Sequence, residues 1–189
     1  MGKQGKPALR LIRGGKDRPL IGSTRITVVA TPDPVAVDAL VREEDTWLIL
    51  SAKPAVTPPA EPLLRIMTEL MAAQPHPPGT VLVREGRPLT LLAVVHDFDA
   101  EPCCRPEWVE AALAGILRLC REREIDAISM PLFGVAHGRL TAEAGVGLIA
   151  HALGQWRERH PHTIYLCVPA EAEDTVRRLL EATAETAGA

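Results

Sequence analysis

The sequence predicts an α/β fold in which helices cover both faces of a mixed, largely parallel central sheet, giving three α/β/α layers. Strand-sized apolar runs alternate with amphipathic helical patterns through the C-terminal half of the chain. One run, residues 89–95, is apolar on both faces, which is typical of a strand inside a covered sheet. The 189 residues, 47% of them hydrophobic and 24% charged, suffice to bury the core of one such domain.

The first 20 residues are interpreted as a basic leader ahead of the domain. Gly14 and Gly15 break any helix there, although residues 8–12 fit a short strand. No aromatic side chains lie between the charges, so we expect a solvated tail rather than a nucleic-acid patch. The positive charges of the leader are Lys3, Lys6, Arg10, Arg13, Lys16 and Arg18.

Three strands and one helix are predicted between residues 21 and 73. Pro32 and Pro34 separate the first two strands and exclude regular pairing between them. A proline-rich connection over residues 51–62 leads into a helix whose apolar residues share one face. The predicted strands cover residues 25–30, 37–41 and 47–50, and the helix covers residues 62–73.

Strands and helices alternate from residue 80 onward. The most regular helix begins at Pro106, in the first turn, where proline is tolerated. Because each helix between two strands acts as a crossover, we expect the strands that it joins to be parallel. The domain is expected to span residues 21–183, with residues 184–189 fraying. The predicted strands are 80–84, 89–95, 125–130 and 163–168, and the helices are 106–124, 141–159 and 171–183.

Bulk properties exclude several classes of protein. The net charge of −3 gives no strong field for nucleic acid or a membrane surface. No apolar run approaches the ~20 residues that span a bilayer, and a secretory pattern is missing, so we expect a cytoplasmic protein without a membrane partner. The four cysteines lack zinc-finger spacing and are expected to be free, mostly buried thiols. We therefore expect no cofactor and no metal.

The clearest candidate site is the loop over residues 131–140, between a buried strand and the next helix. Open α/β folds bind ligands at the carboxyl ends of sheet strands, where this loop lies. Gly134 and Gly138 would let backbone amides approach an anion, and the following helix adds a partial positive charge, so phosphate is the expected guest. The same glycines also fit a plain strand-to-helix turn, with Thr141 as the helix N-cap.

Several segments resemble the macrodomain family, the ADP-ribose-binding module. The resemblance covers residues 26–180 and is most family-like where a helix and a strand lead into Pro131 and the glycine loop. It implies a macrodomain-like α/β domain and a phosphate-bearing ligand, a nucleotide or an ADP-ribose derivative. The segments are ITVVATPDPVAVDALV, LTLLAVVHD, PEWVEAALAGILRLCREREIDAISMPLFG and TIYLCVPAEAEDTVRRLL.

The resemblance also implies which residues bind the ligand. In macrodomains the loop wraps the diphosphate and distal ribose, and residues 133–138 look like a shortened version of it. His137 is interpreted either as a phosphate donor or as a solvent-facing side chain. The adenine-reading Asp of the family is not matched, because its Gly-Asp-Ile segment aligns with residues 30–32 of this chain. The nearest carboxylate is that of Asp33, two positions after Thr31, the residue that aligns with the family Asp. The implied ligand residues are Phe133, Gly134, Val135, Ala136, His137, Gly138, Thr31 and Asp33.

The catalytic part of the family pattern is replaced. Macrodomains carry Asn-Ala-Ala-Asn and a glycine-rich loop where this chain has REED at residues 42–45 and then a stretch without glycine. The added carboxylates oppose a dianionic ligand, so hydrolysis by the family route is not expected. An alternative use of these charges is a divalent-cation site, although a solvated turn is the simpler interpretation. That alternative site would comprise Glu43, Glu44, Asp45, His96, Asp97 and Asp99.

Three functions remain open from the sequence. The first is a binding module that holds a phosphate-bearing ligand with the loop over residues 134–138. The second is a ligand-free scaffold that acts through self-association, as a homo-oligomer, or through a protein partner. The third is an ADP-ribosyl hydrolase, which the replaced family residues disfavour. Loop amides that are open to solvent would favour the first function. A cleft at the loop that is filled by another segment of the chain would favour the second.

Overall fold

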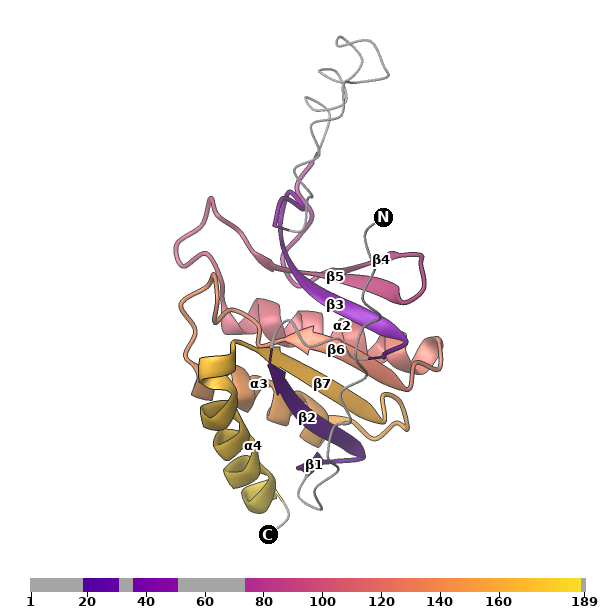
Figure 1. Ribbon diagram of the computed structural model, residues 1–189. Helices are drawn as coiled ribbons and strands as arrows, with labels where there is room; N and C mark the ends of the chain where they lie inside the picture. The colour runs from indigo at the N-terminus through magenta and orange to yellow at the C-terminus, as the bar shows by residue number, and fades with distance from the viewer. Residues whose placement is uncertain (1–18, 31–35, 51–73, 188–189) are drawn as a thin grey trace, which may run out of the picture.

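The computed structural model describes residues 19–30, 36–50 and 74–187. These residues form a seven-stranded sheet in the order β1-β2-β7-β6-β3-β5-β4 (Figure 1). The five central strands are parallel to one another, while β1 and β4 at the two edges run antiparallel to their neighbours. This mixed, largely parallel sheet confirms the predicted α/β class. The strands are β1 (Leu20–Ile21), β2 (Thr24–Ala30), β3 (Ala39–Asp45), β4 (Val81–Arg84), β5 (Leu89–His96), β6 (Ala127–Pro131) and β7 (Thr163–Val168).

The strand pairings follow the sequence pattern. β2 and β3, on either side of the two prolines, are not paired, because β7 and β6 lie between them in the sheet. β5 pairs with β3 on one side and β4 on the other, and its residues 91–96 are buried, as expected for a strand covered on both faces. Since the five central strands are parallel, their carboxyl ends all lie at one end of the sheet, called the carboxyl end below.

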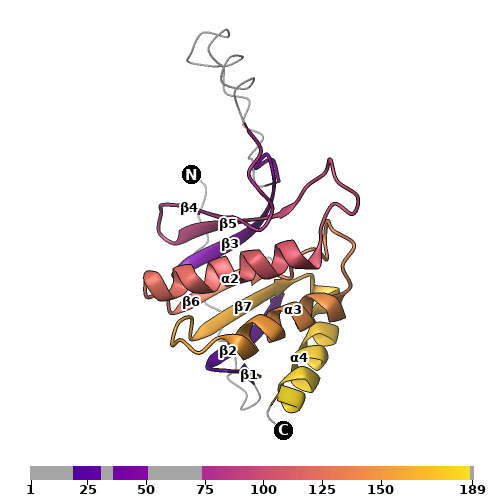
Figure 2. The same cartoon turned by 180° about the vertical axis from the view of Figure 1, so that it is seen from behind.

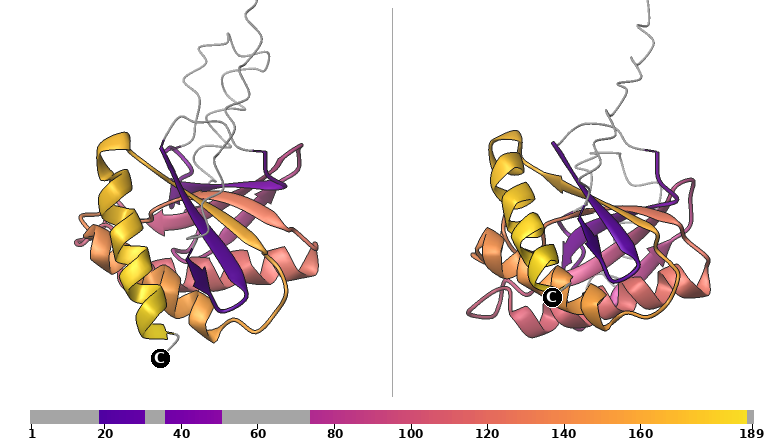
Figure 3. Two further views of the ribbon diagram at one scale, coloured as in Figure 1. Left: turned by 60° about the horizontal axis from the view of Figure 1, so that its bottom comes forward. Right: turned by 90° about the horizontal axis from the view of Figure 1, so that it is seen from below.

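Helices α2 and α3 lie across one face of the sheet (Figure 2). α2 begins at Pro106, as predicted, and packs against β5 and β4. Thr141 caps α3, also as predicted, because its hydroxyl oxygen accepts a hydrogen bond from the N–H of Ala144. α4 packs against α3 and runs beside β1 and β2 (Figure 3). The helices are α2 (Pro106–Glu122), α3 (Ala142–Gln155), the short 3₁₀ helix η1 (Ala170–Ala172) and α4 (Glu173–Ala187).

Two helix ends differ from the prediction by four residues each. α3 stops at Gln155 rather than at residue 159, because the Trp156 backbone is extended and its indole Nε1 donates a hydrogen bond to the carbonyl oxygen of His160. α4 continues to Ala187, past the predicted end at residue 183, through residues that include no glycine or proline to break it. Of the helices that the structure describes, none has the length and apolar character needed to cross a membrane.

The largest difference between prediction and structure lies at residues 42–50. β3 continues through Asp45 instead of ending at residue 41, so the predicted charged turn is part of the strand. The predicted strand at residues 47–50 is wrong, because these residues form a turn. The cause is the buried Asp45 carboxylate, which acts as a cap for the turn and replaces strand pairing. It accepts hydrogen bonds from the backbone N–H groups of Trp47, Ile49 and Leu50.

Some predicted elements lie outside the described residues. They are the strand at residues 8–12, the connection and helix over residues 51–73, and most of the basic leader. The domain limits at residues 21 and 183 therefore stay a prediction, although β1 already begins at Leu20.

The four cysteines are free, as expected, and two of them are buried. Burial raises the pKa of the Cys104 thiol to about 12, and the nearby charges of Glu43 and Cys103 add to the effect. Burial likewise raises the pKa of the Cys120 thiol to about 12, with a further contribution from Asp38. Both thiols therefore stay protonated at neutral pH, where the thiolate is the reactive form.

We expect Cys104 and Cys120 to resist alkylation by iodoacetamide at pH 8 in the folded protein and to react fully in urea. Peptide mass spectrometry after labelling measures this. Folding raises both pKa values, so the contribution of these two thiols to the free energy of unfolding is complete below pH 9. It is lost between about pH 9 and 12, where the thiols ionise in the unfolded chain but not in the folded protein. Equal labelling of Cys120 with and without urea would contradict its burial.

Candidate ligand-binding site

The loop over residues 132–140 lies at the carboxyl end of the sheet, between the end of β6 and the start of α3. β3 and β5 end at the same place, because both run parallel to β6 in the sheet. The ring of His96, at the end of β5, meets the ring of His137 in the loop at an edge, with centroids 5.9 Å apart. The loop therefore adjoins the ends of neighbouring strands, as expected for a ligand site in an open α/β fold.

The loop closes on the carbonyl group of Gly134. This oxygen accepts hydrogen bonds from the N–H groups of Gly138 and Leu140, both at 3.0 Å. Gly134 has a φ of 73°, in the left-handed region that favours glycine. A Cβ atom added to either glycine would lie 3.0 Å from the sulfur of Cys104. The packing of the loop itself therefore requires both glycines, with or without a ligand.

The six loop residues expected to bind ligand divide by exposure. The buried ones are Phe133, Gly134 and Gly138, and the exposed ones are Val135, Ala136 and His137. The Phe133 side chain belongs to the hydrophobic core and supports the loop from inside. Only the exposed residues can present side chains to a ligand. The two other candidates, Thr31 and Asp33, lie outside the described residues.

The N–H of Gly134, a donor expected to bind phosphate, already has a carboxylate partner. It donates a hydrogen bond to Oε1 of Glu43, which is in β3 and has a side chain only 8% exposed. Other loop amides donate to carbonyl groups within the loop. In the outer part of the loop, residues 135–140, the amides without a hydrogen-bond acceptor among the described residues are those of Ala136, His137 and Arg139. The outer part of the loop thus has amides without a protein acceptor, while its inner donor is occupied.

His96 is a buried histidine in contact with this carboxylate. Its side chain is 0% exposed, and neither ring nitrogen has a hydrogen-bond partner among the described residues. Its Nε2 lies 3.6 Å from Oε1 of Glu43, and its ring stacks on Phe98 with centroids 5.8 Å apart. The Glu43–His96 pair is thus a polar element directly beside the loop.

The six residues of the alternative cation site do not converge. The carboxylate of Asp45 binds the amides of its own turn, that of Asp97 accepts from the N–H of Asp99, and that of Glu43 accepts from Gly134. Within the described parts of the chain, the group of side chains that could share a metal ion lies elsewhere. These three carboxylates act as acceptors for backbone N–H groups.

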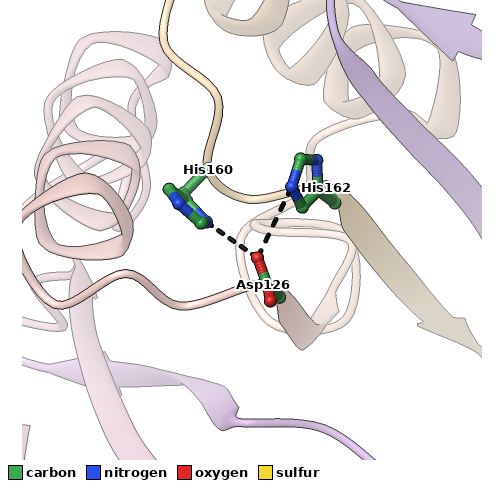
Figure 4. Close-up of side chains that lie close together, drawn as sticks. All are labelled: Asp126, His160 and His162. Carbon is green, nitrogen blue, oxygen red and sulfur yellow. Dashed lines mark ion pairs between the residues drawn. The ribbon is translucent and has the colours of Figure 1, made fainter.

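That group consists of Asp126, His160 and His162 (Figure 4). It lies at the amino end of the sheet, opposite the loop. Neither histidine is among the candidate residues predicted from the sequence. A signal was present, because Asp126 directly precedes β6 and His162 directly precedes β7. The amino ends of neighbouring parallel strands lie side by side, so these residues could have been grouped once the strand order was known.

Comparison with known proteins gives matches among solved structures. No family model matches the sequence, and neither does any curated protein. The Oceanobacillus iheyensis macrodomain with ADP matches with a TM-score of 0.67 over 90% of this chain and 97% of that chain, at 14% identity. The Trypanosoma brucei macrodomain in complex with ADP matches with a TM-score of 0.58 over 82% and 68% of the two chains, at 16% identity.

A third match is the macro domain of ganglioside induced differentiation associated protein 2. Its TM-score is 0.57 over 82% of this chain and 83% of that chain, at 16% identity. These likenesses confirm the three-layer α/β/α class predicted from the sequence. At such low identity they establish the fold, and the ligand has to be argued from the residues of the site.

Proposed function

We propose, from the macrodomain fold of this protein, that it is a binding module for a phosphate-bearing ligand, a nucleotide or an ADP-ribose derivative. Two of the solved macrodomains with this fold are described with ADP bound. The proposed contact is the loop over residues 134–138, together with Thr31 and Asp33 on the basis of the family resemblance.

The observation that carries the proposal is the set of outer loop amides without an acceptor, those of Ala136, His137 and Arg139. They lie just ahead of the N-terminus of α3, whose helix dipole favours negative charge. Successive backbone N–H groups in a tight loop form an anion-binding concavity. The phosphate is therefore proposed to bind the outer part of the loop.

The Glu43 carboxylate modifies this proposal. It accepts the hydrogen bond of the Gly134 N–H, which would otherwise be a further donor to phosphate. Its negative charge also lies close to the proposed phosphate position, which weakens the binding of an anion. We therefore propose a site of moderate affinity that uses fewer backbone donors than the glycine loop suggests.

A scaffold function is the second candidate, and the occupied Gly134 amide favours it. Exposed apolar side chains also gather at the carboxyl end of the sheet: Trp47 and Ile49 follow β3, and Phe98 follows β5. A hydrogen bond from the N–H of Thr46 to the carbonyl oxygen of His96 links the two turns. Self-association through these side chains would appear in light scattering as a mass that rises with protein concentration.

Calorimetric titration with ADP-ribose and with ADP tests the binding function. We expect heat with the wild-type protein and at least about tenfold weaker binding for Ala136→Glu, because a carboxylate at this exposed position repels phosphate. Ala114→Glu adds the same charge at an exposed position on α2 and is expected to bind like wild type. Equal affinity in both variants would place the ligand elsewhere, and no heat with the wild type would favour the scaffold.

A further inference from the structure

A cluster of two histidines and one aspartate lies at the amino end of the sheet, away from the loop over residues 132–140. Nδ1 of His160 lies 2.9 Å from Oδ1 of Asp126, and Nε2 of His162 lies 3.6 Å from the same oxygen (Figure 4). The three candidate ligand atoms all lie within 4.8 Å of one another. Imidazole nitrogen and carboxylate oxygen are the donor set that zinc and its neighbours among the first-row metals accept.

The sheet register brings these residues together. β6 and β7 are parallel neighbours in which Ala127 pairs with Thr163. Asp126 and His162 stand one residue ahead of this pair, each at the amino end of its strand. The carbonyl oxygen of Asp126 accepts hydrogen bonds from the N–H groups of His162 and Thr163, at 2.9 and 3.0 Å. The two side chains are therefore held by the main chain on adjacent strands.

The segment that carries the histidines is fixed by its carbonyl groups. The carbonyl oxygen of His160 accepts from the Trp156 indole at 2.7 Å. That of Pro161 accepts from the Thr24 hydroxyl at 2.9 Å, and that of His162 accepts from the N–H of Arg25 at 2.9 Å. Three consecutive anchors leave little freedom for the backbone. A cluster on such a rigid segment needs little reorganisation to receive an ion.

The separations fit one tetrahedral ion. Two ligand atoms at about 2.0–2.2 Å from a tetrahedral zinc ion lie roughly 3.4 Å apart. The two observed nitrogen-to-oxygen separations, 2.9 and 3.6 Å, lie on either side of that value. Nδ1 of His160 is buried, and despite its closeness to the carboxylate it has no hydrogen-bond partner among the described residues. An ion placed between the two atoms would satisfy both of them.

Exposure leaves one coordination position open to solvent. The Asp126 side chain is 62% exposed, that of His162 is 41% exposed and that of His160 is 19% exposed. Three protein ligands with solvent access leave a fourth tetrahedral position for water or another small ligand. Arg159 competes for one of these ligand atoms, because its Nε donates a hydrogen bond to Nε2 of His162 at 3.1 Å.

We propose that Asp126, His160 and His162 form a binding site for one divalent transition-metal ion, zinc by its ligand chemistry, with an open fourth position. The ion takes Nδ1 of His160, Nε2 of His162 and a carboxylate oxygen of Asp126. Arg159 leaves Nε2 of His162 when the ion binds. The site is at the opposite end of the sheet from the proposed phosphate loop and does not depend on it.

The test is a zinc titration of metal-free protein in competition with a chromophoric chelator. We expect one zinc ion per chain, and at least about tenfold weaker binding in His162→Ala, His160→Ala and Asp126→Asn. His151→Ala removes an exposed histidine from α3 and is expected to bind zinc like wild type. Arg159→Ala is expected to bind zinc more tightly than wild type, because it removes both a competitor and a positive charge.

Two further results bear on the assignment. Cobalt(II) in place of zinc should give the visible absorption of a tetrahedral ion in the wild type and lose it in His162→Ala, whose half-exposed side chain can be removed without disturbing the core. Circular dichroism confirms that each variant is folded. Absence of zinc binding by the wild type, or equal zinc loss in His151→Ala and His162→Ala, would overturn the site. Unchanged zinc affinity in Arg159→Ala would overturn Nε2 of His162 as a ligand atom.

Discussion

Gly138→Ala is expected to destabilise the folded protein by about 2–3 kcal/mol. The added Cβ would lie 2.4 Å from Cβ of Cys104 and 2.9 Å from the carbonyl oxygen of Gly134. Neither atom can move away alone, because the first is fixed by its main chain and the second already accepts two hydrogen bonds. Urea unfolding monitored by circular dichroism measures the loss as a lower midpoint.

Gly147→Ala is the matched control for this substitution. Nothing lies within 4 Å of a Cβ added at Gly147, which is in the interior of α3. Alanine is favoured over glycine in a helix by about 0.5–1 kcal/mol, so this variant is expected to be more stable than wild type. If Gly138→Ala unfolds at the wild-type urea concentration, the loop does not pack on Cys104 as described.

The same crowding makes Gly134→Val a poor probe of ligand binding. A Cβ at Gly134 would lie 2.6 Å from Cδ1 of Leu140, and the φ of 73° is strained for a β-branched residue. Lost binding in that variant would report a rearranged loop. The exposed Ala136 is the better position, because a side chain there can grow toward solvent.

Glu43→Gln is expected to tighten the binding of ADP-ribose and ADP by at least about tenfold, or ~1.4 kcal/mol. The glutamine carbonyl can still accept the hydrogen bond from Gly134, so the loop keeps its shape while the negative charge is removed. Because Glu43 is almost fully buried, solvent screens its charge less than that of a surface carboxylate. Calorimetric titration with each nucleotide measures the change.

Glu110→Gln is the control for Glu43→Gln, since it removes one negative charge from an exposed position on α2. It is expected to leave nucleotide affinity unchanged. If Glu43→Gln binds no more tightly than Glu110→Gln, the carboxylate does not face the bound phosphate. If neither the two variants nor the wild type binds ADP-ribose or ADP, the phosphate site as a whole is rejected.

The sequence predicted best the elements whose buried side chains recur at a regular period. β7 was predicted over its observed residues and α2 to within two residues, because each places apolar side chains at the period of its own secondary structure. The prediction for the segment around Asp45 was wrong because the structure of this segment does not follow from the spacing of its apolar residues. Four apolar residues in a row suggest a strand, whereas the deciding interaction is a buried carboxylate that binds the amides following it.

The position of the candidate loop could be predicted, but the hydrogen bond that already occupies the Gly134 amide could not. A glycine loop between a buried strand and a helix is visible in the sequence. The bond between Glu43 and the N–H of Gly134 joins residues 91 positions apart, and it depends on the register of β3 beside β6. The grouping of Asp126 with the two histidines likewise depends on the pairing of β6 with β7, which no local pattern specifies.

The two edges of the sheet limit how copies of this chain can associate. β1 has only two residues, and β4 has four with the exposed Arg84 at its end. Such short edges offer few unpaired N–H and C=O groups, so a strand from a second copy would gain little by extending the sheet. An assembly of these residues would rest on side-chain contacts such as those of Trp47, Ile49 and Phe98. It would therefore not grow as a β-fibril by the addition of strands.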